Sequence, residues 1–426
     1  MKIIAWLESL AVDATPDMDE CIKMLGPHID YLNRFKDTPQ DPEWHGEGDV
    51  HIHTGMVLDE LYLLLGNEAS HIQVWQRQAL ILGVIMHDIA KPIRTREIEI
   101  QGKIRIGAPQ HEDIGRSYLA FKLHDWGLPF EVIWTVLNLV GEHHMPKLLV
   151  VRNKSAKDYW RLARQVNTEL VYWLEVADMR GRTYPDMAQQ LLYLEEFKLF
   201  AEEYGVWGQS LDVRSKLATE LDQLPPYVQD YVYAHALYQL ENGKITQPEE
   251  ALGTTYQHRE DHSHVVVMCA PSGSGKSTWI NQNYPDYELV SLDVLREEFN
   301  GDRSIQKNKG QILQAAKELL RVSLRKKQGV VWDATNLRSD FRAQIVDLAR
   351  DYHALVTLVV ILQSEKLIAK NNRARKYSVP ESVLDKQLDD YQLPTLNEAH
   401  QYWIVGEKGK TLFRSGYYRE ADDGFC

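Results

Sequence analysis

A short apolar run that leads directly into a glycine-rich segment with a lysine constrains the fold of this chain more than any other feature. Residues 265–269 are Val, Val, Val, Met and Cys, and residues 270–278 read Ala-Pro-Ser-Gly-Ser-Gly-Lys-Ser-Thr. β-Branched residues favour a buried strand, the glycines permit a tight turn, and a helix is expected after the turn. This order predicts a parallel sheet with a phosphate-binding loop at its edge.

The loop carries the groups that binding of a nucleoside triphosphate requires. Its backbone N–H groups can converge on phosphate oxygens, and the start of the following helix adds a partial positive charge. Lys276 is spaced to reach the terminal phosphates, and Ser277 to offer its hydroxyl to Mg²⁺. Ala270 replaces the first glycine of the usual pattern and is the smallest substitute for it. We therefore expect ATP and Mg²⁺ at a site formed by Gly273, Ser274, Gly275, Lys276, Ser277 and Thr278.

Further short β-branched runs follow the loop, at 289–292, 330–332 and 355–362. They alternate with helical stretches such as 312–325, whose apolar positions share one face: Ile312, Ala316, Leu319, Leu320 and Ser323. Strands that alternate with helices predict an α/β domain with a mostly parallel sheet covered on both sides. We assign residues 263–426 to this domain.

Acidic residues follow the second and third predicted strands, where α/β sheets bind their ligands. Asp293 lies three residues before Arg296, and 333–336 reads Asp-Ala-Thr-Asn. Over about residues 264 to 405 the sequence resembles the 5′-hydroxyl polynucleotide kinases, a branch of the P-loop kinases. The resemblance implies that Asp293 takes the proton from the acceptor hydroxyl and that Arg296 holds an acceptor phosphate. It also assigns the family's D-x-T-N segment, expected at the substrate, to Asp333, Thr335 and Asn336.

The same resemblance implies a basic lid over the ATP phosphates. The segment 370–376, Lys-Asn-Asn-Arg-Ala-Arg-Lys, has the composition of such a lid, and arginine suits phosphate because of its bidentate fork. Tyr377 stands where the family usually has an arginine, so Arg373, Arg375 and Lys376 share the assignment. We count Arg373 and Arg375 among the ATP-binding residues.

The N-terminal part of the chain is rich in histidine, with ten of the sixteen histidines in the first 150 residues. Apolar spacing predicts helices through 57–65, 79–86, 130–140 and 160–179, so we expect residues 1–204 to form an all-α bundle. The isoleucines at 98, 100, 104 and 106 alternate with polar residues around Gln101-Gly102, which predicts one small hairpin.

The helix at 79–86 ends in His87-Asp88. Adjacent side chains diverge by about 100° on a helix, so an ion held by both lies near a helix end and takes ligands from other helices. Candidates follow in order along the chain: His53, His111, His143, His144 and Asp178. Over about residues 50 to 182 this order resembles the HD phosphohydrolase superfamily, and especially the HD domains of CCA-adding tRNA nucleotidyltransferases.

The HD resemblance implies a metal centre. A donor set of imidazoles and carboxylates without thiolate suits Mn²⁺, Fe²⁺, Co²⁺, Ni²⁺ or Zn²⁺, and its size allows one ion or two. Asp88 would bridge a pair of ions that activate water, and Lys91, one turn further on, would meet the same phosphate. The choice between His51 and His53 stays open, although Thr54 favours His53. The choice between His143 and His144 also stays open.

Composition limits the remaining possibilities. A chain of 426 residues exceeds what one core usually organises, and the stretch 205–262, with its glycines and Pro225-Pro226, predicts a connector containing one helix. The three cysteines have no paired spacing, and no apolar run reaches the ~18 residues of a membrane span. We therefore expect a cytoplasmic protein.

The net charge of the chain is −13, so contacts to a polyanion such as a nucleic acid must come from local basic clusters.

A phosphohydrolase fused to a kinase suits a substrate with one phosphate to remove and another to add. RNA cleaved to 2′,3′-cyclic phosphate and 5′-hydroxyl ends meets this description. The arrangement resembles bacterial two-domain RNA end-healing enzymes that join an HD phosphohydrolase to a polynucleotide kinase. It implies RNA ends as substrate, with DNA ends as an alternative, and a ligase as partner. Two other functions stay open: a nucleotide-metabolism enzyme acting on mononucleotides and a small alcohol, and a nucleotide sensor.

Overall fold

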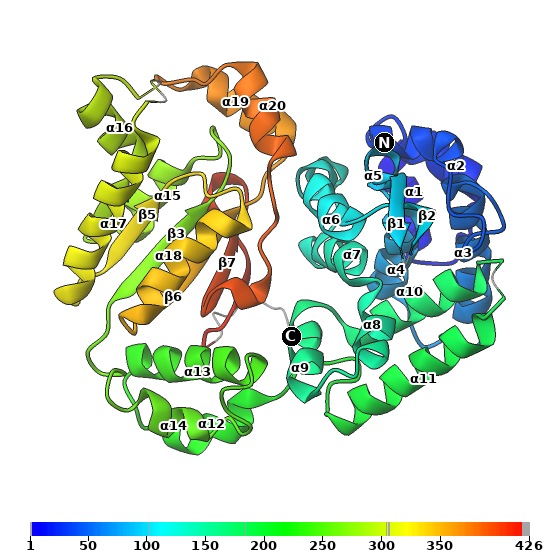
Figure 1. The fold of residues 1–426 in the computed structure, drawn as a ribbon, viewed down its shortest axis with the longest axis horizontal. Helices are drawn as coiled ribbons and strands as arrows, with labels where there is room; N and C mark the ends of the chain where they lie inside the picture. Colours follow the sequence, from blue (N-terminus) through cyan, green and yellow to red (C-terminus); the bar gives the residue numbers. More distant parts are fainter. Residues whose placement is uncertain (1, 101, 184, 304, 306, 420–426) are drawn as a thin grey trace. The chain divides into compact units, whose positions relative to one another are not determined.

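The computed structural model describes residues 2–100, 102–183, 185–303, 305 and 307–419. It divides the chain into two compact units, Met1–Leu211 and Asp212–Cys426. The first unit is helical except for one hairpin, and the second contains a six-stranded sheet with helices around it (Figure 1). No helix among the described residues is both long and apolar enough to cross a bilayer.

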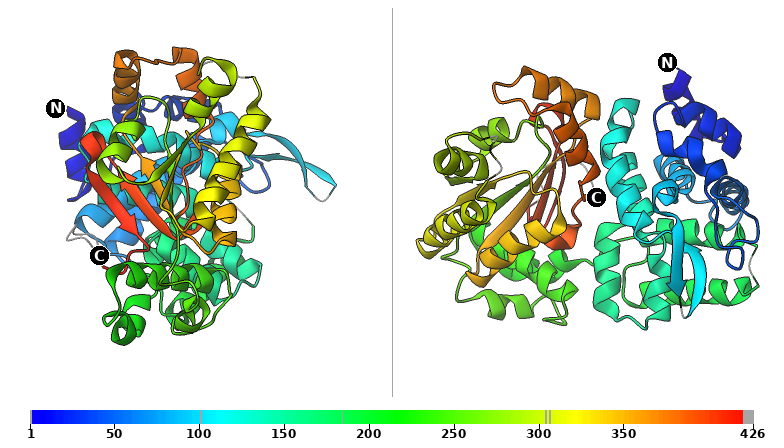
Figure 2. Two further views of the ribbon diagram at one scale, coloured as in Figure 1. Left: turned by 90° about the vertical axis from the view of Figure 1, so that its left-hand side faces the viewer. Right: turned by 45° about the horizontal axis from the view of Figure 1, so that its top comes forward.

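The first unit contains eleven α-helices and two 3₁₀ helices within its described residues. The α-helices are α1 (Lys2–Leu10), α2 (Met18–Leu25), α3 (Val50–Gly66), α4 (Val74–Met86), α5 (Lys91–Arg94), α6 (His111–Lys122), α7 (Phe130–Glu142), α8 (Met145–Val151), α9 (Ala156–Gln165), α10 (Thr168–Arg180) and α11 (Met187–Glu203); the 3₁₀ helices are η1 (Asp30–Asp37) and η2 (Leu123–Trp126). The predicted hairpin is confirmed: β1 (Arg96–Ile100) pairs antiparallel with β2 (Lys103–Gly107) and extends away from the helices (Figure 2). Its residue Gln101 lies outside the described residues.

Helix α4 forms the centre of the first unit. Every side chain from Arg77 to Met86 is buried, and α4 packs against α3, α7 and α10. A helix that is apolar on all sides is stable only when neighbours surround it, which explains why the sequence shows no polar face here. The two flanking helices have well-defined starts, because the side chain of Asp49 accepts from the amide of Ile52 and that of Asn167 from the amide of Leu170.

The second unit has the strand order β4-β5-β3-β6-β7-β8. Its strands are β3 (His264–Cys269), β4 (Glu288–Ser291), β5 (Val330–Asp333), β6 (Leu355–Ile361), β7 (Gln401–Val405) and β8 (Thr411–Ser415). Its helices are α12 (Val213–Leu221), α13 (Pro226–Glu241), α14 (Glu250–Thr255), α15 (Lys276–Asn283), α16 (Leu292–Asn300), α17 (Lys309–Arg325), α18 (Ser339–Asp351), α19 (Glu365–Ala374), α20 (Glu381–Asp389), η3 (Leu396–Glu398) and η4 (Glu407–Gly409).

The four predicted strands of this sheet are confirmed, and each pairs in parallel with its neighbour. Strand β6 is buried along its whole length and β3 along nearly all of it, because helices cover both faces. The sequence analysis missed β7 and β8; β7 extends the parallel sheet, and β8 closes that edge in an antiparallel pair. The stretch expected to be a connector carries α12, α13 and α14, and α12 begins just after the boundary between the units.

Candidate active sites

The glycine-rich loop connects the carboxyl end of β3 to α15 in the second unit. Gly273 and Gly275 both have φ near the left-handed region, 86° and 87°. A Cβ on Gly273 would lie 2.7 Å from the carbonyl oxygen of Ile368, so this position requires glycine. Ala270 is fully buried in the core beside Trp279 and has no unusual backbone angle, which explains why alanine is accepted there. The predicted strand, turn and helix are all present.

Lys276 begins α15, and its ammonium lies within the loop. Nζ donates to the carbonyl oxygens of Ala270 and Pro271, each at 3.0 Å. Burial lowers the pKa of Lys276, while Asp333 and Asp293 counteract that effect. The loop lysine and the two carboxylates that the sequence placed at neighbouring strand ends therefore lie in one electrostatic environment.

The two carboxylates occupy different positions at this edge of the sheet. Asp293 lies in the first turn of α16 and is half-exposed, with Oδ1 2.5 Å from Nη1 of Arg296. Asp333 ends β5, and burial raises its pKa, with Lys276 opposing this rise and Asp293 adding to it. Asp293 is thus the accessible carboxylate, and Arg296 is held beside it.

The segment after Asp333 holds the end of β5 against the end of β3, the strand that leads into the glycine-rich loop. The amide of Ala270 donates to the carbonyl oxygen of Thr335, and Nδ2 of Asn336 donates to the carbonyl oxygen of Met268 at 2.7 Å. The buried Arg342 donates to the carbonyl oxygen of Asn336 at 3.0 Å and pairs with Glu398 through both ends of its fork. Thr335 takes part through its backbone and Asn336 through its side chain. Together these hydrogen bonds keep the ends of β3 and β5 in register.

The basic segment at the end of α19 acts on the loop through the charge of Arg375. Arg375 influences the pKa of both Lys276 and Asp333. Arg373 is exposed near the last turn of α19, and the ring of Tyr377 lies under the guanidinium of Arg303 at 4.7 Å. Arg375 is therefore the residue of this segment whose charge acts on Lys276 and Asp333, and the assignment shared with Arg373 and Lys376 stays a prediction.

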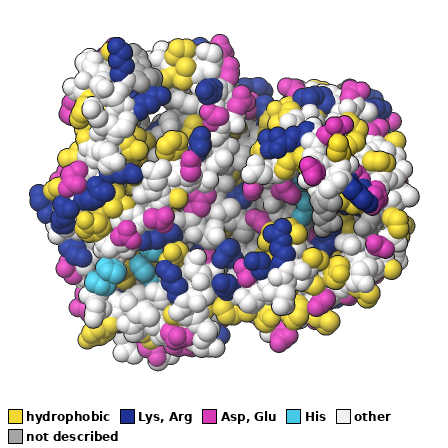
Figure 3. All heavy atoms as spheres, in the orientation of Figure 1, with side chains coloured by type: hydrophobic (Ala, Val, Ile, Leu, Met, Phe, Trp, Pro, Cys, Tyr) yellow, Lys and Arg dark blue, Asp and Glu magenta, His cyan; other side chains and the backbone are white. Residues whose placement is uncertain are grey.

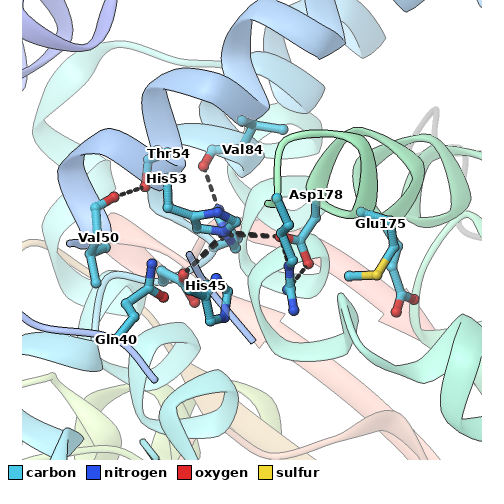
Figure 4. A network of polar contacts seen from close by, with 12 residues as sticks. Gln40, His45, Val50, His53, Thr54, Val84, Glu175 and Asp178 are labelled. Atoms are coloured by element: carbon cyan, nitrogen blue, oxygen red, sulfur yellow. Dashed lines mark hydrogen bonds and ion pairs between the residues drawn. The ribbon is translucent and has the colours of Figure 1, made fainter. Parts of the chain in front are cut away.

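The first unit holds a buried cluster of the histidines and aspartates predicted to bind metal. Nε2 of His53 lies 3.0 Å from Oδ1 of Asp178, and Nε2 of His87 lies 3.2 Å from Oδ2 of Asp88. Nε2 of His111 lies 3.1 Å from Oδ1 of Asp88, so the two oxygens of this carboxylate face different imidazoles. Figure 4 shows how His53 and Asp178 point toward one another from α3 and α10.

Three imidazoles of the cluster are oriented in the same way. Nδ1 of His87, His111 and His143 each lies 2.7 to 2.9 Å from the carbonyl oxygen three residues earlier, which places the proton on Nδ1 and the lone pair on Nε2. Both His143 and His144 lie with His111 in one potential ligand group, so position does not separate the two. His51 instead meets Asp19 at 3.0 Å, so His53 is the inward-facing residue of its pair.

Several buried polar atoms of the cluster make no hydrogen bond of good geometry within the described part of the chain, although some lie at ion-pair distance from a neighbour, such as Oδ2 of Asp88 at 2.7 Å from Nζ of Lys91. They are Nδ1 and Nε2 of His53, Nε2 of His87, both oxygens of Asp88, Nε2 of His111, Nε2 of His143 and Nδ1 of His144. Buried polar atoms are costly when unpaired, and these atoms face one another. Burial and neighbouring imidazoles hold the pKa of His143 and of His144 well below the usual range, which keeps both in the neutral state that binds metal. The residues fit one or two divalent ions.

A pocket of about 360 Å³ opens beside the cluster. Three cationic side chains line it, Lys91, Lys147 and Arg182. Nζ of Lys91 lies 2.7 Å from Oδ2 of Asp88 and also lines the pocket. Apolar lining from Trp44 and Met179 completes a space suited to a phosphate ester with an organic group attached.

Known proteins resemble parts of this chain. A family model described as an AAA domain, AAA_33, matches residues 265–394. The bifunctional polynucleotide phosphatase/kinase of Schizosaccharomyces pombe is 27% identical over 147 residues, which is 33% of this chain and 32% of that protein. The second unit is a P-loop kinase-like domain. A P-loop kinase implies ATP and Mg²⁺, as predicted. A gluconokinase structure from Sinorhizobium meliloti 1021 is similar at 22% identity with a TM-score of 0.27, over 34% of this chain and 83% of its own.

The sequence analysis missed residues that support both sites. In the kinase-like domain, Oε1 of Gln387 on α20 accepts from the amide of Ser272 in the loop at 2.8 Å. In the first unit, Glu47 lies between two histidines: Nδ1 of His45 donates to its Oε1 at 2.9 Å, and Nδ1 of His53 lies 3.0 Å away. Arg182 pairs with Asp178 through two nitrogens. Of these residues, only Arg182 could have been found from the sequence, because it lies four residues after Asp178 and residues at this spacing face each other on a helix.

We expect Glu47→Gln to weaken divalent-metal binding by about 10- to 100-fold, because the carboxylate orients the His53 ring and raises its basicity. Chelator competition on the purified protein measures the affinity directly. Glu43→Gln is the matched control, since Glu43 is exposed and pairs with Arg105 on the hairpin. Equal metal affinity in Glu47→Gln and the control would contradict an orienting role for Glu47.

Proposed function

We propose that this chain heals broken RNA ends with two active sites. The kinase-like domain phosphorylates 5′-hydroxyl ends with ATP, and the helical unit removes the phosphate from 2′,3′-cyclic phosphate or 2′-phosphate ends. The observation that carries the proposal is the presence, in one chain, of a glycine-rich loop that encloses Lys276 and of a buried cluster of histidines and aspartates. Support for the nucleic-acid substrate comes from the fission yeast relative, whose name includes a polynucleotide kinase and of which this chain spans about a third.

The kinase reaction follows from the geometry around the loop. The oxygen of a 5′-hydroxyl attacks the γ-phosphorus of ATP, its proton passes to the carboxylate of Asp293, and the bond to the bridging oxygen breaks to release ADP. Arg296, 2.5 Å from Asp293, is placed to hold a phosphate of the acceptor strand. Lys276 and Arg375 neutralise charge on the transferred group, and Ser277 provides the hydroxyl for Mg²⁺.

The hydrolase reaction uses the buried cluster of the first unit. His53, His87 and Asp178 form one candidate ligand set, and His111, His143 and His144 form a second. We assign Asp88 to both sets, because one of its oxygens lies 3.2 Å from Nε2 of His87 and the other 3.1 Å from Nε2 of His111. Ions bound there would supply Lewis-acid activation of water at neutral pH. Lys91 and Arg182 line the adjacent pocket and neutralise the phosphate oxygens of the substrate. The two ligand sets share Asp88, which supports a paired centre of Mn²⁺, Fe²⁺, Co²⁺, Ni²⁺ or Zn²⁺.

A competition assay with labelled ATP tests the proposal. The purified chain receives a 5′-hydroxyl oligoribonucleotide, the matching DNA and a free nucleoside, and a second assay follows phosphate release from a 2′,3′-cyclic phosphate end. We expect label on RNA and phosphate release from the cyclic end. Transfer to the nucleoside alone would instead indicate nucleotide metabolism, and no transfer to any acceptor would indicate a sensor. Restored ligation after treatment would support a ligase as the partner that uses the products.

A further inference from the structure

The kinase-like domain has a second pocket at the edge of the sheet opposite the phosphate-binding loop. His353 and His400 line this pocket, and they come just before β6 and β7. Because β3, β6 and β7 run parallel, their starts share one edge, whereas Lys276 follows the end of β3. Helices α13 and α14 lie at this lower edge in Figure 1. Ligands of α/β sheets bind at the carboxyl ends of strands, so the nucleotide site does not account for this pocket.

This pocket has a volume of about 220 Å³, and its lining contains cationic side chains. Its nitrogen-bearing side chains are His235, Gln239, Lys244, His258, Arg350, His353 and His400, so four of the sixteen histidines meet here. Among the described residues, no aspartate or glutamate lines it. Figure 3 shows histidine side chains gathered on this face. In a chain with a net charge of −13, a pocket with this lining favours an anion.

Two cations approach one aromatic ring in the pocket. The guanidinium of Arg350 lies 4.0 Å from the ring centroid of Tyr238, and Nζ of Lys244 lies 4.9 Å from the same centroid. Arg350 is fixed further by donation to the backbone carbonyl of Glu398 at 3.0 Å. Nη1 of Arg350 also lies 3.5 Å from Oδ1 of Asp347, a carboxylate outside the pocket lining. Both cations line the pocket, so an anion bound there would be attracted to each of them.

The histidines form two stacked pairs. His258 and His353 lie 3.8 Å apart with an interplanar angle of 6°, and His235 and His400 lie 4.1 Å apart. The pKa of His235 is lowered to about 3, chiefly by burial, with smaller contributions from nearby His262, Arg350 and His353. Burial and then His258 lower the pKa of His353. Burial is the main cause of both shifts, and the smaller contributions of the neighbouring imidazoles and Arg350 are those of a positive local potential that a bound anion would relieve.

We propose that this pocket binds a phosphate group of a nucleotide or a nucleic-acid strand. Lys244 and Arg350 pair with the phosphate oxygens, and His258 and His353 donate to them from the outer part of the pocket. The volume lies below the ~300–1,000 Å³ of sites for larger ligands, so one phosphate with part of its sugar fits. Tyr256 follows the lining residue Thr255, and its ring is exposed. The guanidinium carbon of Arg259 lies 4.8 Å from the centroid of this ring. The Tyr256 ring offers a stacking surface for a base.

Histidine footprinting on the full chain tests this site. Diethyl pyrocarbonate modifies accessible imidazoles, and peptide mass spectrometry gives the rate for each histidine. Inorganic phosphate, a mononucleotide and a short single-stranded RNA are the three probes. We expect at least one of them to slow modification of His258 and His353 while leaving His71, whose side chain is 56% exposed in the first unit, unchanged. Stronger protection by RNA than by inorganic phosphate assigns the phosphate to a strand, and equal protection assigns the site to phosphate alone.

Variants establish which side chains hold the phosphate. Lys244→Gln should raise the probe concentration needed for protection by about tenfold, the effect of one lost charged hydrogen bond. Lys216→Gln is the matched control, because Lys216 is an exposed lysine on α12 outside the lining. Lys276→Ala should leave the protection intact, since it acts at the opposite edge of the sheet. The proposal is overturned if no probe protects His258 or His353, or if Lys244→Gln behaves like the control.

Discussion

Lys276→Ala should reduce phosphorylation of 5′-hydroxyl RNA ends by about 10²–10³-fold, because a preorganised cation at the transferring phosphate is lost. In the structure, Nζ of Lys276 is held by the carbonyl oxygens of Ala270 and Pro271, directly among the loop amides. Phosphate release by the helical unit should continue at the rate of the unmodified chain, since that reaction uses other residues. Labelled ATP and a cyclic-phosphate substrate in parallel assays measure the two rates.

The control for this prediction is Lys410→Ala, which removes an exposed lysine beside β8 in the same domain. It should leave both activities unchanged. If Lys276→Ala silenced phosphate release as well, in a protein that still shows its normal unfolding transition, the assignment of two independent sites would be wrong. If Lys276→Ala retained full transfer to RNA, the loop would not be the site of phosphoryl transfer.

The sheet of the kinase-like domain was largely predictable because its strands are buried on both faces. Such strands read as uninterrupted β-branched runs, and 265–269 and 355–362 show this directly. Strand β7 was not predicted, because its sequence, Gln-Tyr-Trp-Ile-Val, begins with residues that occur in helices and loops as well as in strands. Leu319 was expected on the buried face of α17 but is 47% exposed, whereas Ile312, Ala316, Leu320 and Ser323 are buried as predicted.

The members of the histidine and aspartate cluster were predictable from the sequence, but their arrangement was not. Adjacent residues on one helix diverge, so the sequence offered a choice between His143 and His144. The chain instead changes helix at this point: α7 ends at Glu142 and α8 begins at Met145, which lets both rings join His111. Glu47 could not be predicted as part of the cluster, because it lies in an irregular turn before α3, where the sequence has no periodic pattern. Only the folded chain brings its carboxylate to His53.

Asp88→Asn should abolish phosphate release, by about 10³-fold or more, while phosphorylation of 5′-hydroxyl ends stays unchanged. Asp88 directs one oxygen toward His87 and the other toward His111, so it is the residue shared by both ligand sets. An amide offers one neutral oxygen in place of two charged ones and cannot bridge two cations. Elemental analysis of the purified variant should therefore show a loss of bound transition metal that accompanies the loss of activity.

The metal measurement separates a chemical role of Asp88 from a structural one. Asp88 is completely buried and lies 2.7 Å from Lys91, so the substitution also leaves an ammonium without its carboxylate. Asp125→Asn is the control for a charge change in the same unit, because Asp125 lies on η2 outside the pocket lining and the ligand groups. A folded Asp88→Asn protein that keeps its full metal content and releases phosphate normally would remove the basis for a bridged centre. Loss of kinase activity in the same folded variant would instead show that the two sites depend on one another.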